Sequence, residues 1–294
     1  MDKTLDIAIV GPGKVGTAIG VLAAKAGWTV VAVGGRDAGR AAQSAKAIGP
    51  NVRACTPAQA AGAAGLVLLT VGDDDIAAAC KELAPAFRGG AIVAHCSGVL
   101  GSEVLAPARS HGCRVGSMHP LQTFPSLQAA IKDLPGAYCF IEGDAEAAEA
   151  LHRLAEDLGA HPVPIASTAK AVYHAAAVMA CNYLTALMDA AIAMCNQAGI
   201  DEPTARKALG PLARATLDNI LAEGTAQALT GPIARGDQQT IQRHLGALME
   251  QADLLEVYRA LGRWTVALAV RKGTINSSKA AALRRLLDFP LAKE

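Results

Sequence analysis

DIAIVGPGKVGTAIGVLAA, from Asp6 to Ala24, is the stretch that decides the fold. Ile7 to Val10 form a short apolar run suited to a buried strand, and the Ala-rich segment after Gly16 has helical character. Between them, Gly11-Pro12-Gly13-Lys14-Val15-Gly16 gives G-x-G-x-x-G in the strand–turn–helix context of a dinucleotide-binding loop. Such glycines permit the tight turn, the approach of a pyrophosphate and close helix packing. A glycine turn in an ordinary α/β protein is the alternative; the context favours a dinucleotide site.

The bulk composition narrows the classes of function. The 294 residues suffice for two domains, and 27 basic side chains nearly balance 26 acidic ones, which does not favour nucleic acid or a membrane surface as partner. We expect no secretory signal and a cytoplasmic location. Seven scattered Cys without a C-x-x-C pair indicate reduced thiols and no structural zinc or other metal site. Ala175 to Cys195 is apolar enough to suggest a membrane span, but Asn182 and Asp189 favour a buried helix.

The first half alternates short apolar runs with Ala-rich helical stretches, which is typical of a parallel sheet with helices on both faces. The predicted fold class is α/β, a doubly wound and mostly parallel Rossmann sheet, followed by an all-α domain. Strands are expected at 7–10, 29–33, 52–55, 66–71, 91–94, 114–118, 137–142 and 162–165. Helices after the first are expected at 40–48, 57–63, 76–87 and 145–158.

From Ser167 onward the sequence predicts only helices. Ser167 or Thr168 is expected to cap a long helix that runs to about 198. Further helices are expected at 201–222, 237–251, 253–271 and 279–287. We therefore predict a dinucleotide-binding domain over 1–166 and an all-helical domain over 167–294.

The end of the second predicted strand bears on the choice of cofactor. Arg36 follows Gly16 by 20 positions (36 − 16 = 20), where sites for NAD place an acidic side chain. A guanidinium there offers a planar fork to the 2′-phosphate of NADP. Asp37 could instead reach a ribose hydroxyl, and Arg36 could be a solvated loop charge. NADP is favoured over NAD. The predicted cofactor-binding residues are Gly11, Pro12, Gly13, Lys14, Val15, Gly16, Gly35, Arg36, Val71, Gly72, Asp73, His95 and Ser97.

Reactive residue types follow three further strands, at the sheet edge where reacting groups gather in open α/β folds. Gly72-Asp73-Asp74 is interpreted as a helix N-cap on the nicotinamide-ribose side. In His95-Cys96-Ser97-Gly98, the hydroxyl of Ser97 and the close-approach backbone of Gly98 suit a substrate carboxylate or the nicotinamide amide. His119 could donate to a carbonyl or carboxylate, or its ring could simply bond a neighbouring loop.

The start of the long helix carries a second candidate group. Lys170 and His174 are four residues apart and share a helix face, whereas Asn182 lies about 120° round from Lys170. A Lys at the domain junction can protonate a carbonyl oxygen as hydride arrives, and burial lowers its pKa towards neutrality. The alternative is a surface charge near a helix start.

A third candidate lies in Thr230-Gly231-Pro232-Ile233-Ala234-Arg235-Gly236-Asp237, where Arg235 suits a carboxylate anchor and Asp237 a helix cap. The predicted catalytic residues are Lys170, His174 and His119. The predicted substrate contacts are Ser97, Gly98, His119, Asn182 and Arg235.

The whole chain resembles a family of NADP-dependent oxidoreductases with a Rossmann domain and an all-helical C-terminal domain long labelled only as uncharacterised. Some members of that family are assigned as ketopantoate reductases. More distantly the chain resembles the 6-phosphogluconate and β-hydroxyacid dehydrogenases and pyrroline-5-carboxylate reductase. The resemblance rests on GPGKVG at Gly11, HCSG at His95, MHPLQTF from Met118, KAVYHAAAVMACNYL from Lys170 and TGPIARGD from Thr230.

The resemblance has implications for site residues and assembly. In β-hydroxyacid dehydrogenases a Lys opens the first long C-terminal helix and acts as acid or base, and Lys170 matches it. An Asn on the next turn holds the substrate in those enzymes, and His174 stands there in this chain, which leaves the substrate open. The likeness also implies a homodimer in which the helical domain of one subunit completes the other's site.

These observations lead to one main hypothesis and three alternatives. The chain is expected to be a cytosolic NADPH-dependent reductase of a small oxo-carboxylate, of the ketopantoate type, with Lys170 as proton donor. The first alternative is an imine reductase of the pyrroline-5-carboxylate type, and the second is a deazaflavin-linked NADP oxidoreductase. The third is a non-catalytic dinucleotide sensor, since a fold alone does not establish function.

Overall fold

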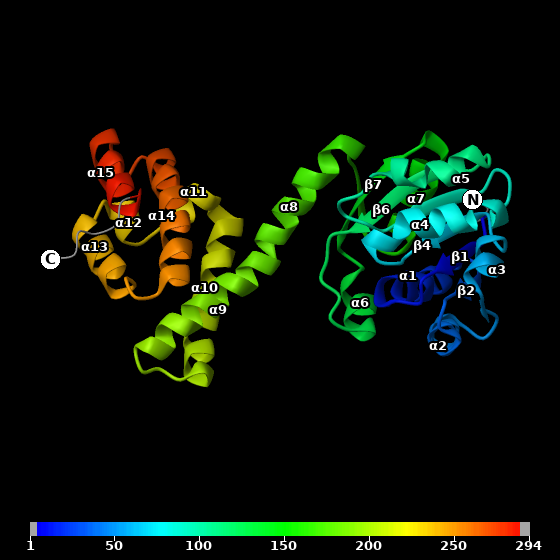
Figure 1. Cartoon of the computed structure of the whole chain (residues 1–294), viewed down its shortest axis with the longest axis horizontal. Helices are drawn as coiled ribbons and strands as arrows, with labels where there is room; N and C mark the ends of the chain where they lie inside the picture. Colours follow the sequence, from blue (N-terminus) through cyan, green and yellow to red (C-terminus); the bar gives the residue numbers. More distant parts are fainter. Residues whose placement is uncertain (1–4, 289–294) are drawn as a thin grey trace. The chain divides into compact units, whose positions relative to one another are not determined.

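The computed structural model describes residues 5–288, which divide between Tyr183 and Leu184 into two compact units (Figure 1). The first unit contains the sheet and the second is helical. The last strand ends at Pro164, and the first unit continues beyond the predicted domain boundary at 166 into the following helix.

The first unit is built on one eight-stranded sheet with the order β3-β2-β1-β4-β5-β6-β7-β8. Neighbouring strands are parallel except β6 and β7, which are antiparallel. The eight expected strands are all present, and the mostly parallel Rossmann sheet is confirmed. The strands are β1 (Ile7–Val10), β2 (Val30–Gly34), β3 (Arg53–Cys55), β4 (Leu66–Leu69), β5 (Ile92–His95), β6 (Arg114–Pro120), β7 (Tyr138–Gly143) and β8 (His161–Pro164).

Helices cover both faces of this sheet, because alternate residues of each strand point to opposite faces. Ile7 and Ile9 pack with α1, α2 and α7, whereas Ala8 and Val10 pack in a second core with α3, α4 and α5. The two cores fix the strand register, since a shift by one residue would exchange the faces. The helical segments are α1 (Lys14–Lys25), α2 (Ala38–Ile48), α3 (Pro57–Ala61), α4 (Asp73–Leu83), η1 (Ala84–Ala86), η2 (Ser102–Leu105), α5 (Ala106–Ser110), α6 (Leu127–Asp133) and α7 (Ala145–Asp157).

Two details of the first unit differ from the expectation. The segments η2 with α5, and α6 with its cap Ser126, were not predicted from the sequence; they are too short to show a helical period. Strand β6 extends two residues past the predicted end at Met118, so that His119 and Pro120 still pair with β7. The start of α4 agrees with the interpretation of Gly72-Asp73-Asp74, with Gly72 in the N-cap position.

The described part of the second unit contains only helices. Its core gathers around Ile241, Leu245, Val266, Leu283 and Leu287. The predicted cap Asp237 is confirmed, because its carboxylate accepts from a backbone N–H group of the helix it precedes. The Asp201 carboxylate does the same for the helix that begins at Glu202. The helices from Glu202 onward are α10 (Glu202–Glu223), α11 (Thr225–Ala228), α12 (Pro232–Arg235), α13 (Gln238–Ala247), α14 (Ala252–Lys272) and α15 (Ser277–Asp288).

The predicted long helix is present in three pieces, η3 (Ser167–Ala169), α8 (Lys170–Ala180) and α9 (Asn182–Gln197), with an interruption at Cys181. The expected cap is wrong: the position before α8 is Ala169, and the hydroxyl of Ser167 donates instead to Glu103 Oε2 at 2.6 Å.

The expectation that this apolar stretch is buried is also wrong for the single chain. In α8 only Lys170 is buried, and α9 has no buried residue. An apolar pattern indicates that a surface is covered but does not say by which molecule. Among the described residues, Ser167–Gln197 alone is long and apolar enough to cross a membrane, with a mean hydropathy of 1.5, and one such stretch is weak evidence for a span.

Candidate active site

The glycine loop is shaped by a close approach of two backbones. Gly11 has a φ of +110°, and a Cβ there would lie 2.7 Å from the carbonyl carbon and oxygen of Thr70. Thr70 Oγ1 donates to Gly11 O at 2.7 Å and would be struck by a Cβ on Gly16. The loop therefore requires glycine at both positions, and Thr70 fastens it to the end of β4. Thr70 was not predicted for the site, because it belongs to no sequence motif.

A cleft of about 490 Å³ lies over this loop at the carboxyl ends of β1, β2 and β4. Seven of the predicted cofactor residues line it, namely Gly11, Pro12, Gly13, Gly35, Arg36, Val71 and Gly72. The other predicted cofactor residues are not part of its lining; they are Lys14, Val15, Gly16, Asp73, His95 and Ser97. Gly16 is buried under the loop, and Lys14 Nζ donates to Pro125 O at 2.8 Å.

The lining of the cleft includes two arginines. Arg36 and Arg40 both line it, and Arg36 Nη2 lies 3.1 Å from Asp75 Oδ2 in an exposed ion pair. Asp37 Oδ1 accepts from the backbone N–H of Arg40 at 3.0 Å, so this carboxylate caps α2. Two guanidinium groups therefore border the place where the sequence predicts a 2′-phosphate. Arg40 was not predicted, because it stands inside an amphipathic helix pattern.

Lys170 is buried at the carboxyl ends of β5 and β6, with 1% of its surface exposed. Its Nζ donates to Ser97 O at 2.9 Å and to Ser117 Oγ at 2.6 Å. No third acceptor for this ammonium group is present among residues 5–288. Burial lowers the pKa of Lys170, and the negative charge of Glu142 opposes that shift. The alternative of a surface charge is therefore excluded.

Below Lys170 lies a buried polar chain that the sequence analysis missed. Ser117 Oγ donates to Glu142 Oε1 at 2.6 Å, and Ser102 donates its backbone N–H to Oε1 and its hydroxyl to Oε2, both at 2.8 Å. Only 8% of Glu142 is exposed. The signal that could have found it is a lone acidic residue at the end of an apolar strand pattern.

His95 and Ser97 shape the loop that carries the Lys170 acceptor. The backbone N–H of Ser97 donates to His95 Nδ1 at 3.1 Å, which leaves the ring hydrogen on Nε2, 3.1 Å from Gly101 O. Burial lowers the pKa of His95 to about 4, so the ring is neutral near pH 7. Ser97 Oγ accepts from the N–H groups of Val99 and Leu100. Both side chains thus hold the loop in place.

His119 and His174 lie against Gly98. A Cβ on Gly98 would be 2.8 Å from both Cε1 and Nε2 of His119 and would strike the ring of His174. The two imidazole centroids are 5.8 Å apart. His119 Nδ1 also forms a 2.9 Å hydrogen bond with the hydroxyl of Tyr173, a residue not predicted for the site. Burial, with the nearby Lys170 charge, lowers the pKa of His119 to about 4, so this ring is also neutral near pH 7.

The structure thus joins Lys170, His119, His174, Ser97 and Gly98 in one group. Asn182 is exposed at the start of α9, after the interruption at Cys181. Arg235 belongs to the helical unit, where its exposed side chain lies at the end of α12. The predicted substrate contacts by Asn182 and Arg235 remain predictions.

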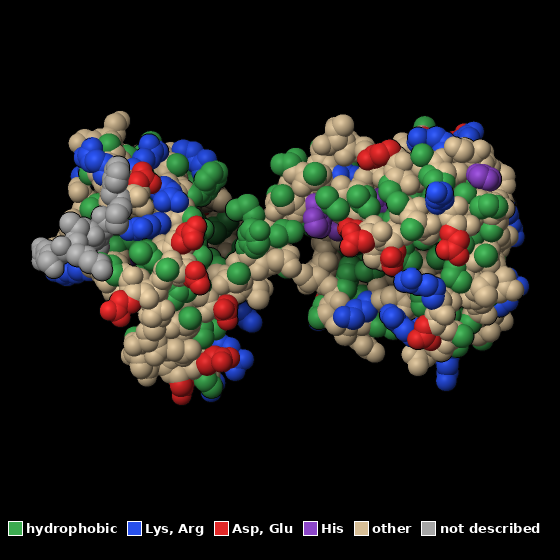
Figure 2. Space-filling model, in the orientation of Figure 1, with side chains coloured by type: hydrophobic (Ala, Val, Ile, Leu, Met, Phe, Trp, Pro, Cys, Tyr) green, Lys and Arg blue, Asp and Glu red, His purple; other side chains and the backbone are tan. Residues whose placement is uncertain are grey.

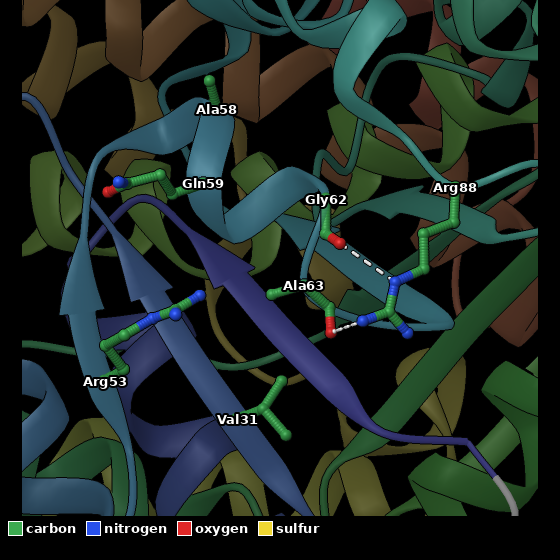
Figure 3. A pocket seen from close by; sticks show the side chains of 7 residues that line it. All are labelled: Val31, Arg53, Ala58, Gln59, Gly62, Ala63 and Arg88. Carbon is green, nitrogen blue, oxygen red and sulfur yellow. Dashed lines mark hydrogen bonds between the residues drawn. The ribbon is translucent and has the colours of Figure 1, made fainter.

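A second hollow, of about 450 Å³, lies beside α3, with Arg53 and Arg88 in its lining (Figure 3). The guanidinium of Arg88 donates hydrogen bonds to the carbonyl oxygens of Gly62 and Ala63, as the dashed lines in Figure 3 show. The residues that line this hollow include no carboxylate, histidine or thiol, so it has none of the groups that distinguish the Lys170 site.

Comparison with known families agrees with this architecture. Residues 1–120 match a Rossmann-like domain, and residues 137–265 match the Domain of unknown function (DUF2520). The chain joins a Rossmann-like domain to a DUF2520 domain. The predicted resemblance to a Rossmann family with a helical, formerly uncharacterised C-terminal domain is thereby confirmed. No relative among the curated proteins matches the chain.

Solved structures share the fold of this chain. Protein TM1727 from Thermotoga maritima is 24% identical with a TM-score of 0.73, over 90% of this chain and 99% of that one. A reductive aminase from Aspergillus terreus, in complex with NADPH and ethyl levulinate, is 20% identical with a TM-score of 0.65, over 96% of this chain and 99% of that one. A 1-pyrroline-5-carboxylate reductase from Streptococcus pyogenes is 15% identical with a TM-score of 0.62, over 97% of this chain and 100% of that one. At these identities the likeness shows the fold.

Proposed function

We propose that this protein is an NADPH-dependent reductase of a small oxo-carboxylate, of the ketopantoate type, in which Lys170 gives the proton. The observation that carries the proposal is the buried ammonium group of Lys170. Two acceptors fix it at the carboxyl ends of β5 and β6, in the same sheet edge as the glycine loop. Burying a charged lysine side chain lowers the stability of the fold, so its burial calls for a function. Titratable groups with perturbed pKa values are concentrated at functional sites.

The residues of the cleft fit a phosphorylated dinucleotide. The backbone of Gly11 and Gly13 is open to a pyrophosphate, and α1 begins there with its N-terminal N–H groups. Arg36 and Arg40 are placed for the 2′-phosphate, which would compete with Asp75 for Arg36. Asp37 Oδ1 accepts from the N–H of Arg40 and so caps α2, which weakens the argument for NAD. NADPH supplies a hydride when bound.

Lys170 donates the proton in this proposal, and His119 and His174 position the substrate. With two of its N–H groups held by Ser97 O and Ser117 Oγ, the ammonium has a third N–H for a substrate oxygen. A proton given to that oxygen as the neighbouring carbon becomes saturated lowers the barrier and raises the rate, typically by a factor of about 10² to 10⁴. If Tyr173 donates to Nδ1 of His119, then Nε2–H of the neutral ring is a donor for the substrate. His174 confines the substrate beside Gly98.

Reduction of a C=N bond is the second candidate. The fold is shared with a reductive aminase and with a pyrroline-5-carboxylate reductase, which act on such bonds or form them. An imine is basic enough to take its proton from solvent, so that reaction depends less on Lys170. The two candidates therefore differ in what the loss of Lys170 does to turnover.

We also propose that the protein is a homodimer whose apolar helices cover one another. Val172, Met179 and Tyr183 are 72%, 65% and 61% exposed, and Leu221 and Trp264 of the helical unit are exposed as well. Figure 2 shows apolar side chains among the charged ones on the visible face of both units. Isolated apolar side chains are normal on a surface, but an almost unburied apolar helix is typical of an interface. Sedimentation of the full chain is expected to give twice the monomer mass, and a monomer at micromolar concentration would contradict this.

The experiment for the proposed function is a substrate screen with the pure full-length protein. NADPH absorbance is followed with small oxo acids, ketopantoate first, and then with cyclic imines. Rapid oxidation of NADPH with one oxo acid supports the proposal, and turnover only with imines moves the assignment to the second candidate. Tight NADPH binding without any turnover contradicts both and favours a deazaflavin-linked enzyme or a sensor.

A further inference from the structure

We propose that Glu142 is a positioning residue for Lys170: through the hydroxyl of Ser117, its buried carboxylate keeps the Lys170 amine in its ammonium form and in place. The proposal rests on the proposed function, in which Lys170 gives the proton. It assigns a role to Glu142 and Ser117, which lie in neighbouring strands and do not line the cofactor cleft.

The sheet register builds this arrangement. Ser117 of β6 and Glu142 of β7 are direct partners in the one antiparallel pairing of the sheet, so their side chains emerge on the same face. Lys170 reaches the same hydroxyl from the first turn of α8. Three segments that are far apart in the chain thus converge on one oxygen atom, Ser117 Oγ.

The hydrogen bonds of this chain have a fixed direction. An ionised carboxylate only accepts, so the hydrogen of Ser117 Oγ points at Glu142 and a lone pair of the same oxygen faces Lys170 Nζ. The two donors of Ser102 fill further acceptor positions on the carboxylate. Without that negative charge the Ser117 hydroxyl could turn and donate to a neutral amine. Glu142 therefore selects the ammonium form by geometry as well as by charge.

Other charged and titratable groups face Lys170 from the elements packed against it. They are Asp73 of α4, His95 of β5, Cys96 after β5, Glu103 of η2 and His119 of β6. His95 and His119 are neutral near pH 7, and burial raises the pKa of the Cys96 thiol to about 12, so it is neutral too. Asp73 and Glu103 are exposed, so water screens their charges. Glu142 is the buried negative charge of the group, with 8% of its surface exposed.

The test measures the ionisation of Lys170 directly, in the full chain and without substrate. Lysine labelled at Cε and Nζ is followed by NMR across a pH titration, and the Lys170 signal is assigned by its loss in Lys170→Met. Glu142→Gln keeps the shape of the side chain and removes the charge, and it is expected to lower the pKa of Lys170 by about one to two units. Glu103→Gln is the matched control; it removes an exposed charge and is expected to cause less than about a third of that shift.

Two further variants keep the test decisive. Glu142→Asp retains the charge and is expected to leave the pKa of Lys170 close to its wild-type value, which separates charge from packing. If Glu142→Gln does not fold, Ser117→Ala breaks the hydrogen-bonded link while leaving the carboxylate, and it is expected to lower the Lys170 pKa as well. A Lys170 pKa in Glu142→Gln or Ser117→Ala that stays within the range of the Glu103→Gln control overturns the proposal.

Turnover gives a second readout that separates this proposal from the proposed function. With an active substrate, kcat is expected to fall at high pH as Lys170 loses its proton. In Glu142→Gln this fall should occur at a lower pH, displaced by the change in Lys170 pKa that NMR measures. The NADPH Kd should not change. An unmoved profile overturns the positioning role of Glu142 even in an active enzyme. If no substrate turns over, the proposed function fails, and the NMR shift still decides whether Glu142 controls Lys170.

Discussion

The cofactor end and the reaction end of the Rossmann unit are built in different ways. At the cofactor end, backbone geometry is decisive: Gly11, Gly13 and Gly16 come from one short stretch, and Thr70 fastens their loop. At the reaction end, side chains are decisive: Lys170, Ser117, Glu142 and His119 come from different elements.

This difference determines how each end responds to change. A backbone site fails when a side chain is added at Gly11 or Gly16, because no space exists for it there. A side-chain site fails when a charge or a hydrogen bond is removed, while the fold persists. The cofactor end should therefore be sensitive to bulk and insensitive to pH, and the reaction end should respond to pH. The following predictions test that contrast.

The largest effect is expected from Gly16→Val. The first added carbon would strike Thr70 Oγ1 and lie 2.9 Å from Gly11 O, so the loop must open. We expect NADPH binding to weaken more than about 100-fold and the free energy of unfolding to fall by about 2–4 kcal/mol. Fluorescence titration and thermal unfolding measure both. Gly210→Ala, with nothing within 4 Å of the added carbon, is the control. Wild-type-like NADPH affinity in Gly16→Val would show that the loop does not hold the cofactor.

The pH dependence of stability is expected to arise at the reaction end. The folded pKa of His95 is about 4, below its ordinary value of 6.5, so the unfolded chain binds more protons between these values. Stability is therefore fully present above pH 6.5 and falls as pH is lowered towards 4, by up to about 3 kcal/mol for this group. Urea unfolding as a function of pH should show a shallower loss in His95→Gln. Equal slopes in the two proteins would contradict the role of this buried ring.

Gly98→Ala tests whether turnover can be reduced without weakening the binding of NADPH. The added methyl group would displace the rings of His119 and His174. We expect turnover to fall by about 10- to 100-fold, a cost of about 1.4–2.7 kcal/mol in the barrier, because catalytic groups lose their alignment. The NADPH Kd should stay constant, since Gly98 does not line the cofactor cleft. A parallel loss of NADPH binding would show that the two ends are not separable.

The smallest effect is expected for Arg36→Ser. Loss of one of two guanidinium groups at the rim should reduce the preference for NADPH over NADH by about tenfold, since an ionic hydrogen bond contributes about 1.5 kcal/mol. Competitive titration of the two cofactors measures this. Lys14→Ser removes a cation of the glycine motif whose Nζ is bonded to Pro125 O, and it should leave the preference unchanged. An unchanged preference in Arg36→Ser would make Arg36 a solvated loop charge.

The same contrast explains what the sequence could predict. The glycine loop, the eight strands and the cap Asp237 follow from local patterns, so they were predicted. Ser117 and Glu142 were missed because their meeting depends on the register of β6 with β7, which no local pattern contains. The burial of α8 and α9 was predicted wrongly, since an apolar pattern does not say whether the same chain covers that surface.

The most direct test of the account is the turnover of Lys170→Met, which keeps the buried stem and removes the ammonium group. The account predicts that reduction of the preferred oxo acid falls by about 10² to 10⁴ while NADPH binds with unchanged affinity. Near-normal turnover with NADPH and an oxo acid would contradict it, because the proton would then come from another group or from solvent.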